Sequence, residues 1–277
     1  MSPRPFTCLV VAGALSLLAS CDQAPSVPAG STAVNAAALE SSASEDAGQG
    51  NGYTYHVRYP QLAPEWSTLA EALHAYAAAR KKDFLEARLA DENADGPTYN
   101  LDLEFNIARR TSDFVSVLAN GSVYTGGAHP MPLVASFNLH TSDNKLIELA
   151  DLFADGSAAL NTLSEEARRQ LEGSYEAKLR ETTPEKDQAA ALKSMREWVA
   201  SGTQATPGNF AAFLVDGLET KAIGLTLIFP SYQVAAHADG TQQVEVPAKV
   251  FYGLLRPEYR DAFQIDTEAA RIAPGVR

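Results

Sequence analysis

The stretch Asp113–His140 reads DFVSVLANGSVYTGGAHPMPLVASFNLH, and it decides which fold class the chain adopts. Its apolar runs are short and rich in residues that favour strands. The pair Asn120-Gly121 is the strongest short signal for a hairpin turn, so we expect one strand before it and one after it. Hairpins join antiparallel strands, whereas parallel strands need long crossovers. The stretch therefore predicts an antiparallel sheet.

Helical and strand patterns extend from this stretch in both directions. Tyr53–Tyr59 alternates apolar and polar residues, which predicts a half-buried strand, and residues 64–90 carry an apolar stripe at helical spacing. Further strands are expected at 101–107, 133–140, 145–149, 209–215, 222–229, 231–236 and 241–246, and further helices at 160–179 and after Thr183-Pro184. We predict the α+β class, with antiparallel sheets and helices packed on them. An N-terminal strand-helix unit would precede a C-terminal strand-helix-helix-strand unit.

Residues 1–20 have the pattern of a targeting signal. Arg4 precedes the apolar run Cys8–Ser20, which is too short to span a membrane as a permanent helix. The run ends in Leu18-Ala19-Ser20-Cys21, which resembles the lipobox of bacterial lipoproteins. That resemblance implies cleavage before Cys21 and attachment of lipid to this cysteine. An ordinary secretory signal followed by a coincidental cysteine is the alternative.

The composition bounds the rest of the chain. Residues 21–51 contain mostly Ala, Ser, Gly, Pro and acids, which predicts a flexible tether. The chain has 277 residues, 45% of them hydrophobic, which suits one medium domain or two small ones. A net charge of −12 without a basic cluster argues against nucleic acid as a partner. The charge either favours a cationic protein partner on electrostatic grounds or, as is more common, keeps the protein soluble.

The segment that follows the first predicted helix nearly fits a calcium-loop template. Its candidate metal ligands are Asp91, Asn93, Asp95 and Asp102. Gly96 stands where the template needs a sharp turn, but the last position lacks the usual bidentate glutamate. The segment is therefore either a calcium site or a polar connection between a helix and a strand.

The glycine-rich stretch Tyr124–Pro132 is the main candidate for a functional site. Gly126 and Gly127 either let a ligand approach the backbone or supply the φ angles of a turn. As a catalytic base His129 would need a nucleophile or an orienting carboxylate, and no G-x-S-x-G or H-E-x-x-H motif supplies one. Tyr232, five residues before His237, either lines a partner surface or packs on a strand. We predict no catalytic residue. The candidate ligand-binding residues are Gly126, Gly127, His129 and Tyr232.

Three phrases in this order resemble a known family. They are YTGGAHP from Tyr124, LIELADLF from Leu146, and GLTLIFPSYQVAAHADGTQQVEVP from Gly224. The phrases are similar to a paired domain of formerly unknown function. It is found outside the membrane in the lysozyme-binding anti-sigma factor RsiV and in the peptidoglycan deacetylase PdaC. We expect residues 52–122 to form the N-terminal member of the pair and residues 123–277 the C-terminal member.

The resemblance implies a binding module of the cell envelope. Neither the anti-sigma segment nor the separate deacetylase domain has a counterpart that we identify in the sequence, so we carry over neither activity. We predict a non-catalytic protein, anchored to the membrane by lipid and facing the periplasm. Its ligand would be lysozyme, another protein or a peptidoglycan-related polymer, with no cofactor unless calcium binds. The alternatives are an envelope hydrolase or deacetylase that uses His129, and a calcium-stabilised structural protein.

Overall fold

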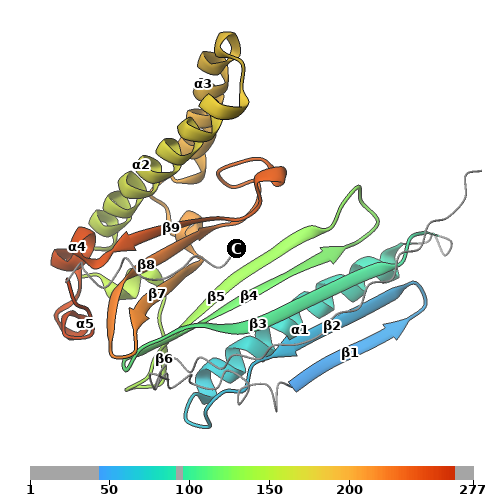
Figure 1. Ribbon diagram of the computed structural model, residues 1–277. Coiled ribbons are helices and arrows are strands. Elements are labelled where there is room, and N and C mark those ends of the chain that lie inside the picture. The colour runs from blue at the N-terminus through green and yellow to red at the C-terminus, as the bar shows by residue number, and fades with distance from the viewer. Residues whose placement is uncertain (1–43, 92–95, 266–277) are drawn as a thin grey trace, which may run out of the picture. The chain divides into compact units, whose positions relative to one another are not determined.

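The computed structural model describes residues 44–91 and 96–265, which form two sheets and their covering helices (Figure 1). The first sheet holds, in spatial order, β1 (Ser44–Gly50), β2 (Tyr53–Tyr59), β3 (Tyr99–Arg110), β4 (Phe114–Tyr124), β5 (Met131–His140) and β6 (Lys145–Leu146). The second holds β7 (Phe213–Leu218), β8 (Lys221–Phe229) and β9 (Gln242–Pro247). The helices are α1 (Ser67–Ala90), α2 (Gly156–Thr182), α3 (Glu185–Gly202), α4 (Ala248–Phe251) and α5 (Pro257–Arg260). The predicted α+β class is confirmed.

One pair of neighbouring strands departs from the antiparallel expectation. β2 and β3 run parallel, with Tyr53 opposite Tyr99, because α1 carries the chain from the end of one strand back to the start of the next. The other strand pairs of the two sheets are antiparallel. The first sheet is therefore mixed.

The expected hairpin turn at Asn120-Gly121 is wrong. Both residues lie inside β4, and Gly121 pairs with Leu103 on one side and Leu133 on the other. A Cβ atom on Gly121 would lie 2.1 Å from the backbone oxygen of Asp102. Glycine is needed here because the backbones of β3 and β4 approach each other closely. The turn between β4 and β5 lies at residues 125–130 instead.

Several other elements differ from the sequence-based expectation. The strand expected at 145–149 ends at Leu146, and the strand expected at 209–215 begins only at Phe213, because a 3-10 helix takes up residues 149–152 and another takes up residues 207–210. The tether was expected to reach Asn51, but Ser44–Gly50 forms β1, which pairs antiparallel with β2. This edge strand is held by backbone hydrogen bonds and stays mostly exposed, so its polar composition concealed it. The expected strand over Ser231–Ala236 is instead part of the loop between β8 and β9. The predicted signal peptide, Cys21 and the rest of residues 1–43 lie outside the described residues.

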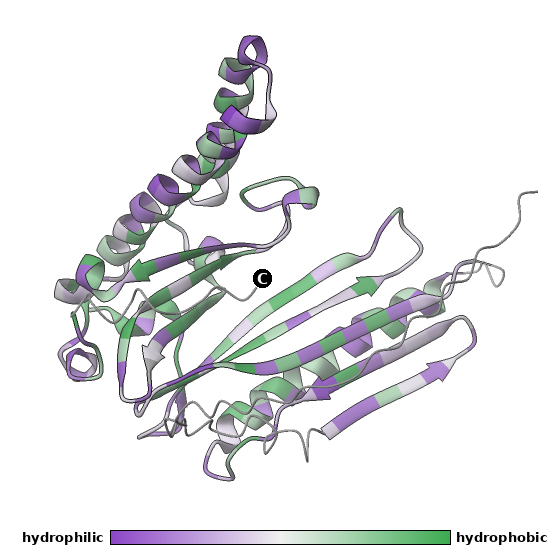
Figure 2. Cartoon of the chain, viewed as in Figure 1, coloured by the Kyte–Doolittle hydropathy of each residue, from purple (hydrophilic) through white to green (hydrophobic). Residues whose placement is uncertain are grey.

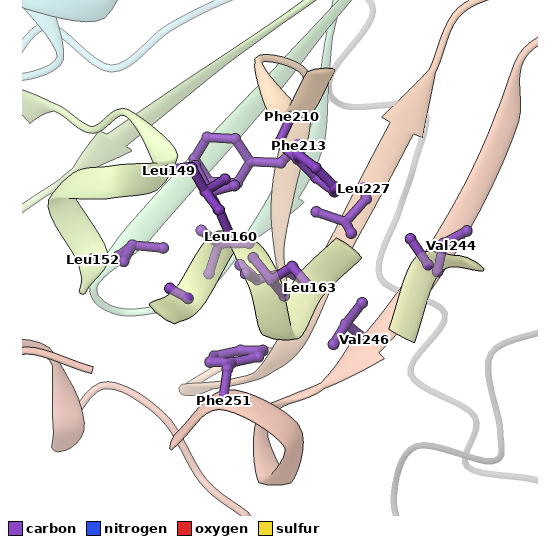
Figure 3. Packing of buried hydrophobic residues seen from close by; sticks show 14 of the residues in the cluster. Leu149, Leu152, Leu160, Leu163, Phe210, Phe213, Leu227, Val244, Val246 and Phe251 are labelled. Atoms are coloured by element: carbon purple, nitrogen blue, oxygen red, sulfur yellow. The ribbon is translucent and has the colours of Figure 1, made fainter. Parts of the chain in front are cut away.

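Each sheet buries its apolar residues beneath a helix. On the first sheet, Leu69 and Leu73 of α1 pack with Phe105 of β3, where hydrophobic and hydrophilic residues alternate as the colours of Figure 2 show. On the second sheet, Leu160 and Leu163 of α2 lie among strand side chains (Figure 3). Within residues 44–91 and 96–265, no helix is long and apolar enough to cross a membrane.

A buried polar junction joins the two sheets. The Asn138 side chain of β5 donates from Nδ2 to the backbone oxygen of Phe213 in β7, at 3.0 Å. Ser116 of β4 donates to Asn138 Oδ1 at 2.6 Å and accepts from the Val215 backbone N–H at 3.0 Å. Asn138 and Ser116 are 2% and 0% exposed, so each hydrogen bond replaces water that cannot reach them. The junction holds β7 against β4 and β5.

Replacing Asn138 with Ala should destabilise the protein by about 2–4 kcal/mol, because it leaves the Ser116 hydroxyl and the Phe213 carbonyl buried without these partners. Urea unfolding measures this change. Asn120→Ala is the matched control, since Asn120 is exposed within β4 and should change stability by less than about 0.5 kcal/mol. Equal losses for the two variants would contradict the role of the junction.

Candidate functional site

Two of the predicted site residues meet although they are far apart in sequence. His129 lies in the turn between β4 and β5, and Tyr232 lies in the loop between β8 and β9. The Tyr232 hydroxyl and His129 Nε2 are hydrogen-bonded at 3.2 Å. Gly126 and Gly127 belong to the same exposed turn as His129. Gly126 has a φ of 89°, which favours glycine, whereas the φ of Gly127 lies outside this left-handed region.

Two further rings complete the cluster. His237, in the short 3-10 helix His237–Asp239, lies edge-on to His129 with ring centroids 4.5 Å apart. Its ring is also 5.2 Å from that of Tyr232. Trp198 of α3 donates from its indole nitrogen to the backbone oxygen of Tyr232 at 3.0 Å. We call His129, Trp198, Tyr232 and His237 the aromatic patch.

The backbone of Tyr232 is strained and firmly held. Its φ of 74° lies in the left-handed region, which a residue with a large side chain rarely adopts. Its N–H donates to the Ala235 carbonyl at 3.1 Å, and the next side chain, Gln233, donates to the carbonyls of Gly202 and Asn209. These bonds fix the loop, and the ring of Tyr232 remains 44% exposed. Strain of this kind is concentrated at functional sites.

The patch has the features of a binding surface. Trp198 is 38% exposed, and Met131, at the start of β5, is 53% exposed. Rings that are exposed yet hydrogen-bonded in place lose little freedom when a ligand packs on them. Tyrosine and tryptophan are enriched among the residues that contribute most to binding. The arrangement therefore offers a preorganised aromatic platform.

The patch does not have the features of an acid–base site. His129 is exposed, and its Nδ1 donates to the Pro130 carbonyl at 3.4 Å, so Nε2 accepts from Tyr232 in this tautomer. Among the described residues no carboxylate is within hydrogen-bond distance of His129. His237 Nε2 is buried without a hydrogen-bond partner there. A general base needs an orienting partner and a substrate proton within reach, and the described residues supply no such partner.

The four candidate calcium ligands are only partly described. Asn93 and Asp95 lie outside the described residues. Asp91 accepts a hydrogen bond from the Tyr99 hydroxyl at 3.1 Å, and Asp102 forms an ion pair with Arg58 at 3.3 Å. Over residues 44–91 and 96–265, no three His, Cys, Asp or Glu side chains are grouped as metal ligands. Calcium binding stays a prediction.

Two family models match the chain, and they meet at the aromatic patch. Residues 48–132 match the model described as Deacetylase PdaC, and residues 150–249 match the protein of unknown function DUF3298. The chain carries the paired PdaC and DUF3298 domains. His129 belongs to the PdaC-type match, and Trp198, Tyr232 and His237 belong to the DUF3298 match. The border that we expected between residues 122 and 123 falls inside β4.

A relative from Bacillus subtilis (strain 168) carries the same kind of sequence. The peptidoglycan-N-acetylmuramic acid deacetylase PdaC is 25% identical over 213 residues. The match covers 76% of this chain and 41% of the relative. The paired-domain chain thus spans about two-fifths of the length of that deacetylase.

Two crystal structures share the fold. A DUF3298 family protein from Pseudomonas aeruginosa PAO1 has a TM-score of 0.53 at 17% identity, over 78% of this chain and 92% of that one. A DUF3298 family member from Bacteroides fragilis NCTC 9343 has a TM-score of 0.51 at 16% identity, over 80% and 95% of the two chains. At these identities the likeness shows that the paired-domain fold is shared.

Sequence reasoning identified His129 and Tyr232 but missed Trp198. Trp198 directly precedes Val199, which belongs to the apolar face of α3. The helical pattern therefore assigned Trp198 no function of its own. The available signal was that Trp198 follows Met195 by three residues, which places the two side chains next to each other on the helix surface. Its partner, the Tyr232 carbonyl, is 34 residues away and could not be inferred from spacing.

Substitutions at Tyr232 should separate backbone strain from ring packing. Glycine relieves the strain at φ 74°, whereas alanine keeps it, and both remove the ring. We expect Tyr232→Gly to be more stable than Tyr232→Ala by about 1 kcal/mol, measured by thermal and urea unfolding. If alanine were equal to or better than glycine, Tyr232 would not be strained as described.

Proposed function

We propose that this protein is a non-catalytic binding module of the bacterial cell envelope, and that its aromatic patch binds a peptidoglycan-type polymer. The observation that carries the proposal is the convergence of four aromatic side chains from both domains at one exposed place. Binding sites are frequent where domains meet. The relative named as a peptidoglycan deacetylase supports the class of ligand.

The chemistry of the patch suits a sugar chain. The faces of pyranose rings present C–H groups that pack on aromatic rings, while their hydroxyls bond to nearby polar atoms. Trp198 and Tyr232 supply exposed ring surface, and the Tyr232 hydroxyl, which donates to His129, can still accept a hydrogen bond from a sugar hydroxyl. None of these four side chains carries a permanent charge, which favours a ligand whose contacting part is neutral.

Lysozyme is the second candidate, and a separate observation favours it. The chain has a net charge of −12, which attracts a cationic protein over long range. Tyrosine and tryptophan also act as anchors in protein interfaces. This interaction would weaken steeply as salt rises, because exposed charges are screened, whereas stacking on a neutral sugar would not.

Catalysis by His129 has less support. A hydrolase or deacetylase needs a general base that is oriented and close to its substrate. The two bonds described for His129 lead to a backbone carbonyl and a phenol, neither of which orients the ring as a carboxylate does. We therefore place the function in binding.

Lipid attachment would keep the module at a membrane surface. Cys21 ends a lipobox-like sequence, and the described residues begin at Ser44. The intervening residues would be a tether between an acylated Cys21 and the first sheet. In this arrangement the module faces the periplasm, where wall polymers are present.

Retention on insoluble peptidoglycan tests the binding proposal. We expect the wild-type protein to be retained, and His129→Ala and Tyr232→Ala to weaken retention about tenfold, the effect of losing one important contact. Leu89→Ala is the control, because Leu89 is an apolar side chain 85% exposed on α1 and outside the patch. A parallel capture with lysozyme at low and high salt distinguishes the second candidate. Retention by neither ligand would contradict the proposal.

Metabolic labelling with a fatty-acid analogue tests the anchor. Cys21→Ser should abolish labelling and move the protein to the soluble fraction, because this cysteine would carry the lipid. Cys8→Ser is the matched control, since Cys8 lies in the segment expected to be removed. Unchanged labelling of Cys21→Ser would exclude this cysteine as the anchor.

A further inference from the structure

A groove of about 310 Å³ lies next to the aromatic patch, between α2, α3 and the end of the loop before β9. Its lining includes Tyr175 and Leu179 of α2, Met195 and Trp198 of α3, and Val234 and Asp239 of the loop. Helices α2 and α3 run side by side here (Figure 1). A volume of this size is at the lower end of the range for small-molecule sites.

Trp198 belongs to both the groove and the aromatic patch. Its indole nitrogen bonds to the Tyr232 carbonyl, so the orientation of its ring is fixed relative to the patch. A ligand on the patch could therefore extend into the groove without rearrangement of this side chain. Trp198 is therefore the residue that links the groove to the patch.

The groove contains a buried polar group that lacks a partner. Tyr175 is 8% exposed, and its hydroxyl has no hydrogen-bond partner among the described residues. Burial raises the pKa of Tyr175 to about 12, and the charge of Asp239 contributes to the rise. The phenol therefore stays protonated at neutral pH and can donate a hydrogen bond. An unpaired buried hydroxyl costs about 1–3 kcal/mol, which a ligand acceptor would offset.

The charges in the groove cancel. Lys178 and Asp239, which come from α2 and the β8–β9 loop, form an ion pair with each other. The pair balances its own charge, and Leu179, Met195 and Val234 supply apolar wall beside the hydroxyls of Thr182 and Ser194. The groove is suited to a small neutral group that has an apolar part and a hydrogen-bond acceptor.

We propose that this groove binds the acetamido group of an N-acetylhexosamine residue. This inference rests on the proposed function and specifies its ligand. The acetamido methyl packs on Leu179, Met195 and Val234, and the carbonyl oxygen accepts from the Tyr175 hydroxyl. The sugar ring lies against Trp198, and the glycan continues over the aromatic patch. A purely apolar occupant fits less well because it would leave the Tyr175 hydroxyl unpaired. A carboxylate also fits less well, because it would lie near the negative charge of Asp239, whose cationic partner Lys178 is already paired.

Titration with defined trisaccharides tests the proposal. The full chain is titrated by calorimetry with the trimer of N-acetylglucosamine and with cellotriose, which has hydroxyls in place of acetamido groups. We expect the acetylated trimer to bind at least about tenfold more tightly. Equal affinities for the two sugars, or no binding of the acetylated trimer, would overturn the proposal.

Two variants locate the effect in the groove. Tyr175→Phe removes only the hydroxyl, so it should weaken the acetylated trimer by about 3- to 10-fold and leave cellotriose unchanged, without loss of stability. Ala191→Phe should fill the groove and abolish the preference for the acetylated sugar. Ala190→Phe is its matched control, because Ala190 is exposed on the same helix and does not line the groove.

The outcomes separate this inference from the proposed function. If Ala191→Phe and Tyr175→Phe bind the acetylated trimer as the wild type does while His129→Ala and Tyr232→Ala lose peptidoglycan, the groove proposal fails and the patch proposal stands. If the wild type prefers the acetylated trimer but is not retained by peptidoglycan, the groove binds its sugar and the proposed function fails.

Discussion

The position of the candidate site depends on the buried hydrogen bonds among Ser116, Asn138 and β7. Asn138 and Ser116 face each other across β5 and β4, and both contact the backbone of β7. Because β7 is paired with β8, these bonds also set where β8 ends and where its loop begins. The β4–β5 turn grows from the same two strands that carry the junction. The same hydrogen bonds therefore relate the β4–β5 turn to the β8–β9 loop, which carry three of the four residues of the aromatic patch.

Local patterns in the sequence predicted much of this fold, and the long-range relations could not be predicted from them. The alternation in Tyr53–Tyr59 and the helical stripe before Ala90 were correct because each element buries one face. The pair Asn120-Gly121 misled because close strand packing needs glycine as much as a turn does. Edge strand β1 buries little apolar surface and so leaves no hydrophobic pattern.

The same distinction applies to the site. His129 and Tyr232 were recognised individually, but their contact spans 103 residues and follows from the packing of two sheets. The parallel pairing of β2 and β3 likewise depends on how α1 packs, which periodicity does not specify. Strain at Tyr232 and the unpaired Tyr175 hydroxyl are properties of the folded chain alone. These two features, more than any motif, indicate a surface that is preorganised for a ligand.

Hydrogen–deuterium exchange with soluble peptidoglycan fragments tests most directly whether the two domains bind one ligand together. We expect slower exchange in residues 125–130 of the PdaC-type domain and in residues 231–239 of the DUF3298 domain at the same fragment concentration. Exchange in β1 and β2 should not change. Protection confined to one domain, or centred on the first two strands, would contradict a shared site at the aromatic patch.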